Sequence, residues 1–165
     1  MIEELVRILF VDDDQLVLGS LRRTLRGFPW EVHFCGDPTD AVRMVEELRI
    51  DVIVTDQAMP QMSGVDLLSS LAAHHEHVVR VMMTGHGDRH LAMRAINDCH
   101  VFRFIDKPWN DAALKVTLQD AATLALRRRQ EESERRAALT GRSSVRLHRD
   151  QAQSLFDLGS PQPEK

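Results

Sequence analysis

The sequence predicts an α/β fold: a doubly wound, parallel, five-stranded sheet with helices on both faces. Three observations predict it. Five short apolar runs look like buried strands, stretches with helical spacing separate them, and the two kinds of segment alternate along the chain. Continuous apolar runs are typical of strands covered on both faces of a parallel sheet. Alternating strands and helices join through right-handed crossovers, which place helices on both faces, so we expect five β/α units.

The expected strands are four or five residues long and mainly apolar. They are RILFV (7–11), EVHFC (31–35), DVIVT (51–55), RVMMT (80–84) and FRFI (102–105).

The segments between the strands repeat apolar residues every three or four positions, as one face of a helix does. In the first, Leu18, Leu21 and Leu25 recur in this way. The other expected helices include AVRMVEEL (41–48), GVDLLSSLAA (64–73), LAMRAINDC (91–99) and DAALKVTLQDAATLALRRR (111–129).

Composition changes at Arg127, where the chain becomes charged, polar and poor in large apolar groups. We therefore expect a core domain over 1–126 and a helical extension with a flexible tail over 127–165. Mixed charges at helical spacing favour continuing the fifth helix to about Ala138. Gly141, Ser143 and Ser144 favour a break there. The final residues have the composition of a disordered tail.

The overall charge argues against some functions. The chain has a net charge of -4 and a pI near 6.0, so bulk electrostatics gives no reason to expect nucleic-acid or anionic-membrane binding. The two cysteines lack the spacing of a metal site and fit buried thiols in a reducing compartment. The sequence shows neither a secretory signal pattern nor an apolar stretch long enough for a membrane span. We expect a cytoplasmic protein.

Polar side chains follow four of the expected strands. Asp12 and Asp13 end the first, Asp56 ends the third, Thr84 ends the fourth, and Lys107 follows the fifth. Ligands of an open parallel sheet bind outside the carboxyl ends of its strands. We therefore expect these side chains to gather in one pocket.

Asp14 completes the triplet Asp12–Asp14 but has a different expected role. It precedes the first helix and is expected to be its N-cap, accepting backbone N–H bonds.

Carboxylates in one pocket require a cation, and an all-oxygen ligand set suits Mg²⁺. A lysine neutralises a further anion, and a threonine hydroxyl hydrogen-bonds it. The pattern thus indicates phosphoryl chemistry, in which an aspartate can itself be the nucleophile and form an acyl phosphate. Each motif alone also fits a solvated turn; the combined order and spacing make the pattern specific.

With these residues in this order, the sequence resembles the receiver domain of two-component response regulators, which has a flavodoxin-like fold. The resemblance runs from about Arg7 to Leu126. It rests on VDDD (11–14), TDQAMPQMSG (55–64), MTGHGD (83–88) and RFIDKPW (103–109). Within the family, the sequence is similar to receivers of the hydrogenase-regulator and RpfG type.

The resemblance implies a role for each matching residue. Asp56 is the expected phosphoacceptor and is also expected to be a metal ligand. Asp13 is the expected direct Mg²⁺ ligand, with Asp12 acting largely through water and the backbone carbonyl of Ala58 completing the protein ligands.

The resemblance also implies which residues respond when the domain is phosphorylated. Thr84 is the expected hydroxyl that contacts the phosphoryl group, and Phe104 the aromatic that moves with it. Lys107 is expected to pair with a phosphoryl oxygen, and its bond to Pro108 is expected to be cis.

Three positions depart from the commoner family pattern. Ala58 is small and apolar where many receivers carry a larger polar side chain. His86 is a polar side chain two residues after Thr84. Both positions flank the path of hydrolytic water in the family, so they are candidates for tuning hydrolysis. Phe104 lacks the hydroxyl of the commoner tyrosine.

The partner implied by the resemblance is a histidine kinase or a phosphotransfer protein. We expect a signalling module that assists its own phosphorylation rather than a conventional enzyme. We expect neither specific nucleic-acid binding nor membrane binding, and homodimerisation stays open.

Other interpretations are also open. The chain can be a single-domain regulator, or the receiver part of an HD-GYP-type cyclic-di-GMP phosphodiesterase or a transcription regulator. A haloacid-dehalogenase-type phosphatase is disfavoured, because DDDQLV (12–17) contains no threonine, which its nucleophile loop requires. The complete site set argues against an adaptor that ignores phosphorylation.

Overall fold

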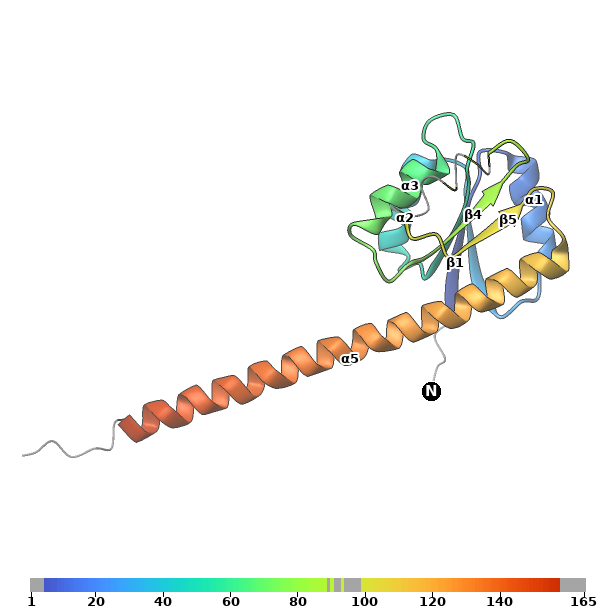
Figure 1. Ribbon diagram of the computed structural model, residues 1–165. Coiled ribbons are helices and arrows are strands. Elements are labelled where there is room, and N and C mark those ends of the chain that lie inside the picture. Colours follow the sequence, from blue (N-terminus) through green and yellow to red (C-terminus); the bar gives the residue numbers. More distant parts are fainter. Residues whose placement is uncertain (1–4, 89, 91–92, 94–98, 158–165) are drawn as a thin grey trace, which may run out of the picture. The chain divides into compact units, whose positions relative to one another are not determined.

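The computed structural model describes residues 5–88, 90, 93 and 99–157 of the chain (Figure 1). Five parallel strands form one sheet in the order β2-β1-β3-β4-β5. Each lies within one residue of its predicted bounds, and the predicted fold class is confirmed. The strands are β1 (Val6–Val11), β2 (Trp30–Cys35), β3 (Val52–Asp56), β4 (Val79–Thr84) and β5 (Arg103–Asp106).

Helices cover both faces of the sheet, as a doubly wound fold requires. On one face, α1 (Gln15–Thr24) and the first turns of α5 (Asp111–Asp157) pack against alternate residues of the strands. On the other face, α2 (Pro38–Glu47) and α3 (Gly64–Ala72) cover the remaining alternate residues. The central strands β1, β3 and β4 are almost entirely buried, which explains their apolar runs. The fourth predicted helix falls on 91–99, most of which lies outside the described residues.

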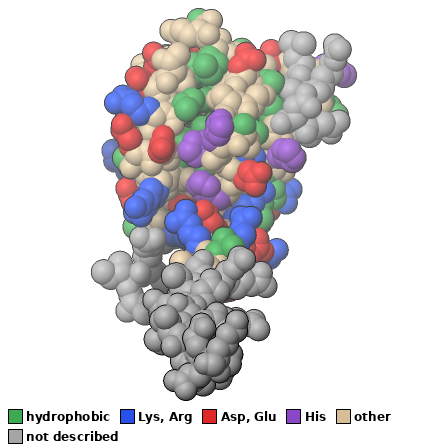
Figure 2. Space-filling view, turned by 90° about the vertical axis from the view of Figure 1, so that its left-hand side faces the viewer, with side chains coloured by type: hydrophobic (Ala, Val, Ile, Leu, Met, Phe, Trp, Pro, Cys, Tyr) green, Lys and Arg blue, Asp and Glu red, His purple; other side chains and the backbone are tan. Residues whose placement is uncertain are grey.

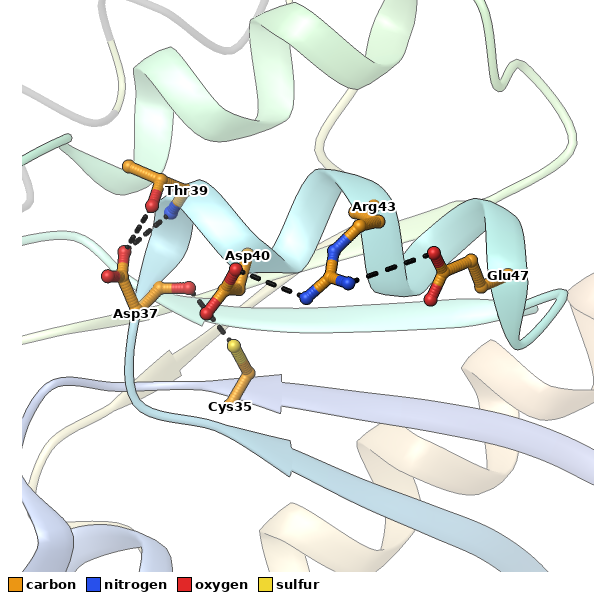
Figure 3. Close-up of polar contacts among 6 residues, drawn as sticks. All are labelled: Cys35, Asp37, Thr39, Asp40, Arg43 and Glu47. Atoms are coloured by element: carbon orange, nitrogen blue, oxygen red, sulfur yellow. Dashed lines mark hydrogen bonds and ion pairs between the residues drawn. The ribbon is translucent and has the colours of Figure 1, made fainter.

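Side-chain caps start α1 and α2. Asp14 Oδ1 accepts a hydrogen bond of 2.8 Å from Leu16 N, so the predicted N-cap of α1 is confirmed. At the start of α2, Asp37 Oδ1 accepts hydrogen bonds from the backbone N (2.8 Å) and the hydroxyl (2.7 Å) of Thr39 (Figure 3).

The exposed side of α2 carries an ion-pair ladder. The Arg43 guanidinium lies between Asp40, at 3.4 Å, and Glu47, at 3.9 Å, one turn away on either side (Figure 3). Exposed pairs of this kind contribute little stability, so α2 is held mainly by its apolar face and its cap.

Helix α5 is longer than predicted. It runs from Asp111 to Asp157, so the break predicted at Gly141 to Ser144 is wrong. A glycine inside a helix costs only about 1 kcal/mol relative to alanine, and the helix formers on both sides of Gly141 outweigh this cost. The end of the predicted tail, 158–165, lies outside the described residues.

The chain divides into two compact units, Met1–Arg128 and Arg129–Lys165. The first contains the whole sheet and the helices that cover it. No helix among the described residues combines the length and the apolar character that a membrane span needs.

Candidate functional site

The ends of β1 and β3 bring the predicted carboxylates together. Val11 pairs with Thr55 in the sheet, so Asp12 and Asp56 lie side by side on neighbouring strands. Carboxylate oxygens of Asp12, Asp13 and Asp56 all lie within 4.8 Å of one another. Asp12 and Asp56 are buried, at 1% and 6% exposed, while Asp13 is exposed at the rim. The cluster thus has a buried floor and one side open to solvent.

The triplet Asp12–Asp14 divides into distinct tasks. Asp14 caps α1, and its own backbone N donates a 2.9 Å hydrogen bond to Asp12 Oδ1. That bond holds the Asp12 carboxylate over the end of β1 and leaves its other oxygen for the pocket. Repulsion within the triplet is limited because only Asp12 and Asp13 share the pocket.

Lys107 is the positive charge of the site. Its Nζ lies 2.7 Å from Asp12 Oδ2 and 2.9 Å from Asp56 Oδ1. Its backbone N donates a 2.8 Å hydrogen bond to Thr84 O, which fixes the residue beyond the end of β5. The Lys107–Pro108 peptide bond is cis, as the family resemblance predicted.

Burial and charge shift the pKa values of this pair in the same direction. Burial raises the pKa of Asp56; the Lys107 ammonium opposes this, and the neighbouring Asp12 charge adds to it. Burial alone would lower the pKa of Lys107, but its hydrogen bonds and Coulomb attraction to Asp12 and Asp56 outweigh burial and raise it. The single ammonium of Lys107 therefore does not fully compensate the negative charge of the carboxylates. Further positive charge in the pocket would favour the ionised form of Asp56.

Thr84 ends β4 with its hydroxyl buried and unpaired. The residue is 1% exposed, and in the described part of the chain its Oγ1 is one of two buried side-chain atoms without a hydrogen-bond partner, the other being Arg80 Nε. A buried hydroxyl without a partner carries a desolvation penalty. Beside it lies a cavity of about 180 Å³ lined by Thr84, Gly85, His86 and Asp106. The Thr84 hydroxyl is thus a hydrogen-bond donor without a partner, and it lies next to a cavity.

The remaining predicted residues are less buried. Ala58 and His86 are exposed, and His86 lines the cavity beside Thr84. Phe104, in β5, is half-buried and packs against the apolar cluster beneath α2 and α3.

Sequence reasoning missed Gln57, which directly follows Asp56. Its side chain is 8% exposed, and its Oε1 accepts a 3.1 Å hydrogen bond from Val65 N at the start of α3. No pattern in the sequence marked it, because its partner Val65 lies eight residues away across a loop.

The residues fit a hard divalent cation. All the side-chain donors in the cluster are carboxylate oxygens, which Mg²⁺ prefers. Octahedral Mg²⁺ places its ligand atoms roughly 3–4 Å apart, close to the spacing found here. The excess negative charge and the solvent-facing side also suit an ion that keeps several waters.

Fold and site together define a flavodoxin-like α/β domain whose acidic pocket, with one lysine, lies at the carboxyl ends of β1 and β3. Residues 8–119 match the family described as the response regulator receiver domain. The chain belongs to this family. Receiver domains act in phosphorelay signalling and are signalling domains rather than conventional enzymes.

Relatives and solved structures agree with this assignment. The hydrogenase transcriptional regulatory protein HoxA of Bradyrhizobium diazoefficiens is 31% identical over 157 residues, covering 92% of this chain and 32% of that protein. The transcriptional regulatory protein FixJ of Rhizobium meliloti is 34% identical over 114 residues, covering 68% of this chain and 54% of that protein.

Among solved structures, the signal receiver domain of an HD domain-containing protein from Pseudomonas fluorescens matches with a TM-score of 0.70 and 30% identity, covering 74% of this chain and 98% of that one. A response regulator receiver domain protein from Clostridium thermocellum matches with a TM-score of 0.66 and 30% identity, covering 76% and 98%. The chain spans about a third of HoxA and about half of FixJ.

Proposed function

We propose that Asp56 is the phosphoacceptor of this receiver domain. The observation that carries the proposal is the position of Lys107 Nζ, within 2.9 Å of carboxylates from both β1 and β3, beside a cluster of three aspartates. Asp56 is the member at the centre of the sheet, between the ends of β1 and β4, and it contacts the lysine directly. Its carboxylate is therefore placed to attack a phosphoryl group that approaches from the open side.

The proposed step transfers a phosphoryl group from a phosphohistidine donor. A bond forms between an Asp56 carboxylate oxygen and phosphorus, and the bond between phosphorus and the imidazole nitrogen breaks. The leaving imidazole keeps the electron pair and takes a proton from solvent. Water later attacks the phosphorus, the bond between phosphorus and the Asp56 oxygen breaks, and inorganic phosphate leaves with the carboxylate restored.

The other site residues neutralise and orient the incoming group. Asp12, Asp13, Asp56 and the Ala58 backbone carbonyl would hold Mg²⁺, which would supply positive charge to the phosphoryl oxygens when bound. Lys107, freed in part from Asp56, pairs with a phosphoryl oxygen.

The unpaired Thr84 hydroxyl supplies the proposed switch. A phosphoryl oxygen on Asp56 would give this buried donor the partner it lacks in the unphosphorylated structure. A new bond to Thr84 shifts the population toward a state in which β4 and the neighbouring Phe104 move together.

The proposed partner is a histidine kinase or a phosphotransfer protein of the cytoplasm. The free, buried cysteines support a reducing compartment. Acidic and basic side chains intermingle, with histidines among them, over the face in Figure 2, which supports a role without specific nucleic-acid binding. A homodimer is compatible with these features.

Residues 127–165 are proposed to form an extension of the receiver domain over 1–126. Within the described residues, helix α5 follows β5. The process that the whole protein controls depends on the partner or domain that α5 contacts.

Acetyl phosphate labelling tests the proposed function. Wild-type protein with Mg²⁺ should acquire an acid-stable, hydroxylamine-sensitive phosphate, and Asp56→Asn should acquire none. Asp14→Asn is the matched control, because it keeps a capping side chain and should be labelled like wild type. Equal labelling of Asp56→Asn and wild type would refute the assignment.

A further inference from the structure

Two residues satisfy the first turn of α3. The first four backbone N–H groups of an α-helix have no partner within the helix. Here Gly64 N donates to Gln57 O (3.0 Å) and Val65 N donates to Gln57 Oε1 (3.1 Å). Asp66 N donates to the Ser63 hydroxyl (3.1 Å), and Leu67 N makes the first regular helical bond, to the Ser63 carbonyl (3.0 Å).

Gln57 therefore occupies a junction of three elements. Its backbone continues β3 directly from Asp56, and its own N donates a 3.0 Å hydrogen bond to Met83 O in β4. Its carbonyl and side-chain amide both accept from α3. The residue is buried, so water does not compete for these bonds. Three hydrogen bonds therefore tie Gln57 to β4 and to α3.

The loop from Ala58 to Ser63 leaves the sheet from this junction. Ala58 directly follows Gln57 and is exposed. The next residue, Met59, is buried in the apolar cluster beneath α2 and α3. The peptide that carries the Ala58 carbonyl is therefore held between two buried residues, Gln57 and Met59.

We infer that Gln57 is a positioning residue for the metal: its side-chain bond to Val65 N holds the loop so that the Ala58 carbonyl faces Asp12, Asp13 and Asp56. The inference rests on the proposed function and adds a residue that touches neither metal nor phosphoryl group. A neutral amide suits the position, because it accepts a hydrogen bond from a helix N-terminus without adding charge beside buried Asp56.

Three variants separate positioning from helix stability. Gln57→Met keeps the length of the side chain and removes the acceptor. Gln57→Glu keeps an acceptor in place. Ser63→Ala removes a side-chain cap from the same turn of α3 without touching Gln57. Each variant is titrated with Mg²⁺ by calorimetry and unfolded with urea in EDTA.

Gln57→Met should weaken Mg²⁺ binding about tenfold, the size of effect seen when partners that orient a ligand are lost. Gln57→Glu should bind Mg²⁺ at least as tightly as wild type. Ser63→Ala should lower the urea midpoint and leave Mg²⁺ affinity unchanged. Gln57→Asn, which withdraws the acceptor by one methylene, repeats the comparison if Gln57→Met does not fold.

Two results would overturn the inference while leaving the proposed function intact: equal Mg²⁺ affinity for Gln57→Met and wild type, or an equal loss of affinity in Ser63→Ala. An equal loss of affinity in Ser63→Ala would mean that Gln57 acts only by stabilising the helix. A wild-type protein that binds no Mg²⁺ would overturn the metal site of the proposed function and this inference with it.

Discussion

Gly64 lies directly against the backbone carbonyl of Asp56, so close that a Cβ atom at Gly64 would overlap the carbonyl oxygen and lie 3.0 Å from the carbonyl carbon. The backbone of α3 therefore begins in contact with the end of β3. This contact brings Gly64 N within hydrogen-bonding distance of Gln57 O, at 3.0 Å. The glycine is required here for space rather than for backbone conformation.

Gly64→Ala should lower the free energy of unfolding by about 2 kcal/mol, because the overlapping atoms belong to the backbone and cannot rotate away. Gly19→Ala is the control within α1: its Cβ would meet nothing closer than an Arg23 side-chain nitrogen at 3.7 Å. That variant should raise stability by up to about 1 kcal/mol. Urea denaturation measures both, and an unchanged Gly64→Ala midpoint would contradict the close approach.

Asp13→Ala and Asp14→Ala should change different properties, Mg²⁺ affinity and metal-free stability respectively, although the residues are neighbours. Asp13 contributes to the carboxylate cluster, and Asp14 caps α1. Asp13→Ala should weaken Mg²⁺ binding strongly with little effect on metal-free stability. Asp14→Ala should cost about 1 kcal/mol of stability and keep most of the Mg²⁺ affinity. Metal titration with urea melts in EDTA separates them; equal losses of affinity would mean that the triplet acts as one unit.

Much of this site follows from sequence, because strand order alone places residues such as Asp12 and Asp56 together. Parallel strands share a carboxyl edge, and short apolar runs locate their ends to within a residue. Gln57 could not be found in this way, since its role depends on a loop that returns to it at Val65. The length of α5 was missed for a different reason: a single Gly141 costs too little to end a long helix.

Thr84→Val should stabilise the unphosphorylated protein and abolish its response to phosphorylation. Valine fills nearly the same volume and removes a buried hydroxyl without a partner, so stability should rise by about 1 kcal/mol. Wild type should gain stability when beryllofluoride and Mg²⁺ occupy the site, and the variant should gain much less. Urea melts with and without beryllofluoride test both parts. A less stable apo variant would show that the hydroxyl has a partner in solution.

The Asp37 cap of α2 should make stability depend on pH at the acidic end. Hydrogen bonds from the Thr39 hydroxyl and backbone N lower the pKa of Asp37 in the folded protein. The unfolded chain, with its ordinary value near 3.9, therefore binds the proton first as the pH falls. The contribution of Asp37 is complete above that value and disappears as the pH falls through the lowered folded-state pKa.

Asp37→Asn gives the comparison for this prediction, because asparagine also caps helices but does not titrate. The stability of wild type relative to Asp37→Asn should decline as the pH falls below about 4, through the lowered folded-state pKa of Asp37. Other carboxylates titrate in the same range but contribute equally to both proteins. Thermal melts across this range would contradict the prediction if the two curves stayed parallel.

His86 is proposed to set the lifetime of the phosphoryl group. It is exposed and lines the cavity beside Thr84, while Ala58, on the other flank, offers no side-chain hydrogen bond to a water. Hydrolysis requires a water in line with phosphorus, opposite the Asp56 oxygen, and the open approach over Ala58 leaves His86 as the side chain that can orient it. His86→Ala should then slow dephosphorylation about tenfold, below the roughly 100-fold that a full general base contributes.

The decisive measurement is phosphate release from purified phosphoprotein in the presence of Mg²⁺. His90→Ala, which removes another exposed imidazole, is the matched control and should behave like wild type. Faster release from His86→Ala would instead mean that the imidazole shields the phosphoryl group from water. Equal rates in all three proteins would remove His86 from the hydrolysis step, because an orienting side chain cannot be deleted without slowing the attack that it orients.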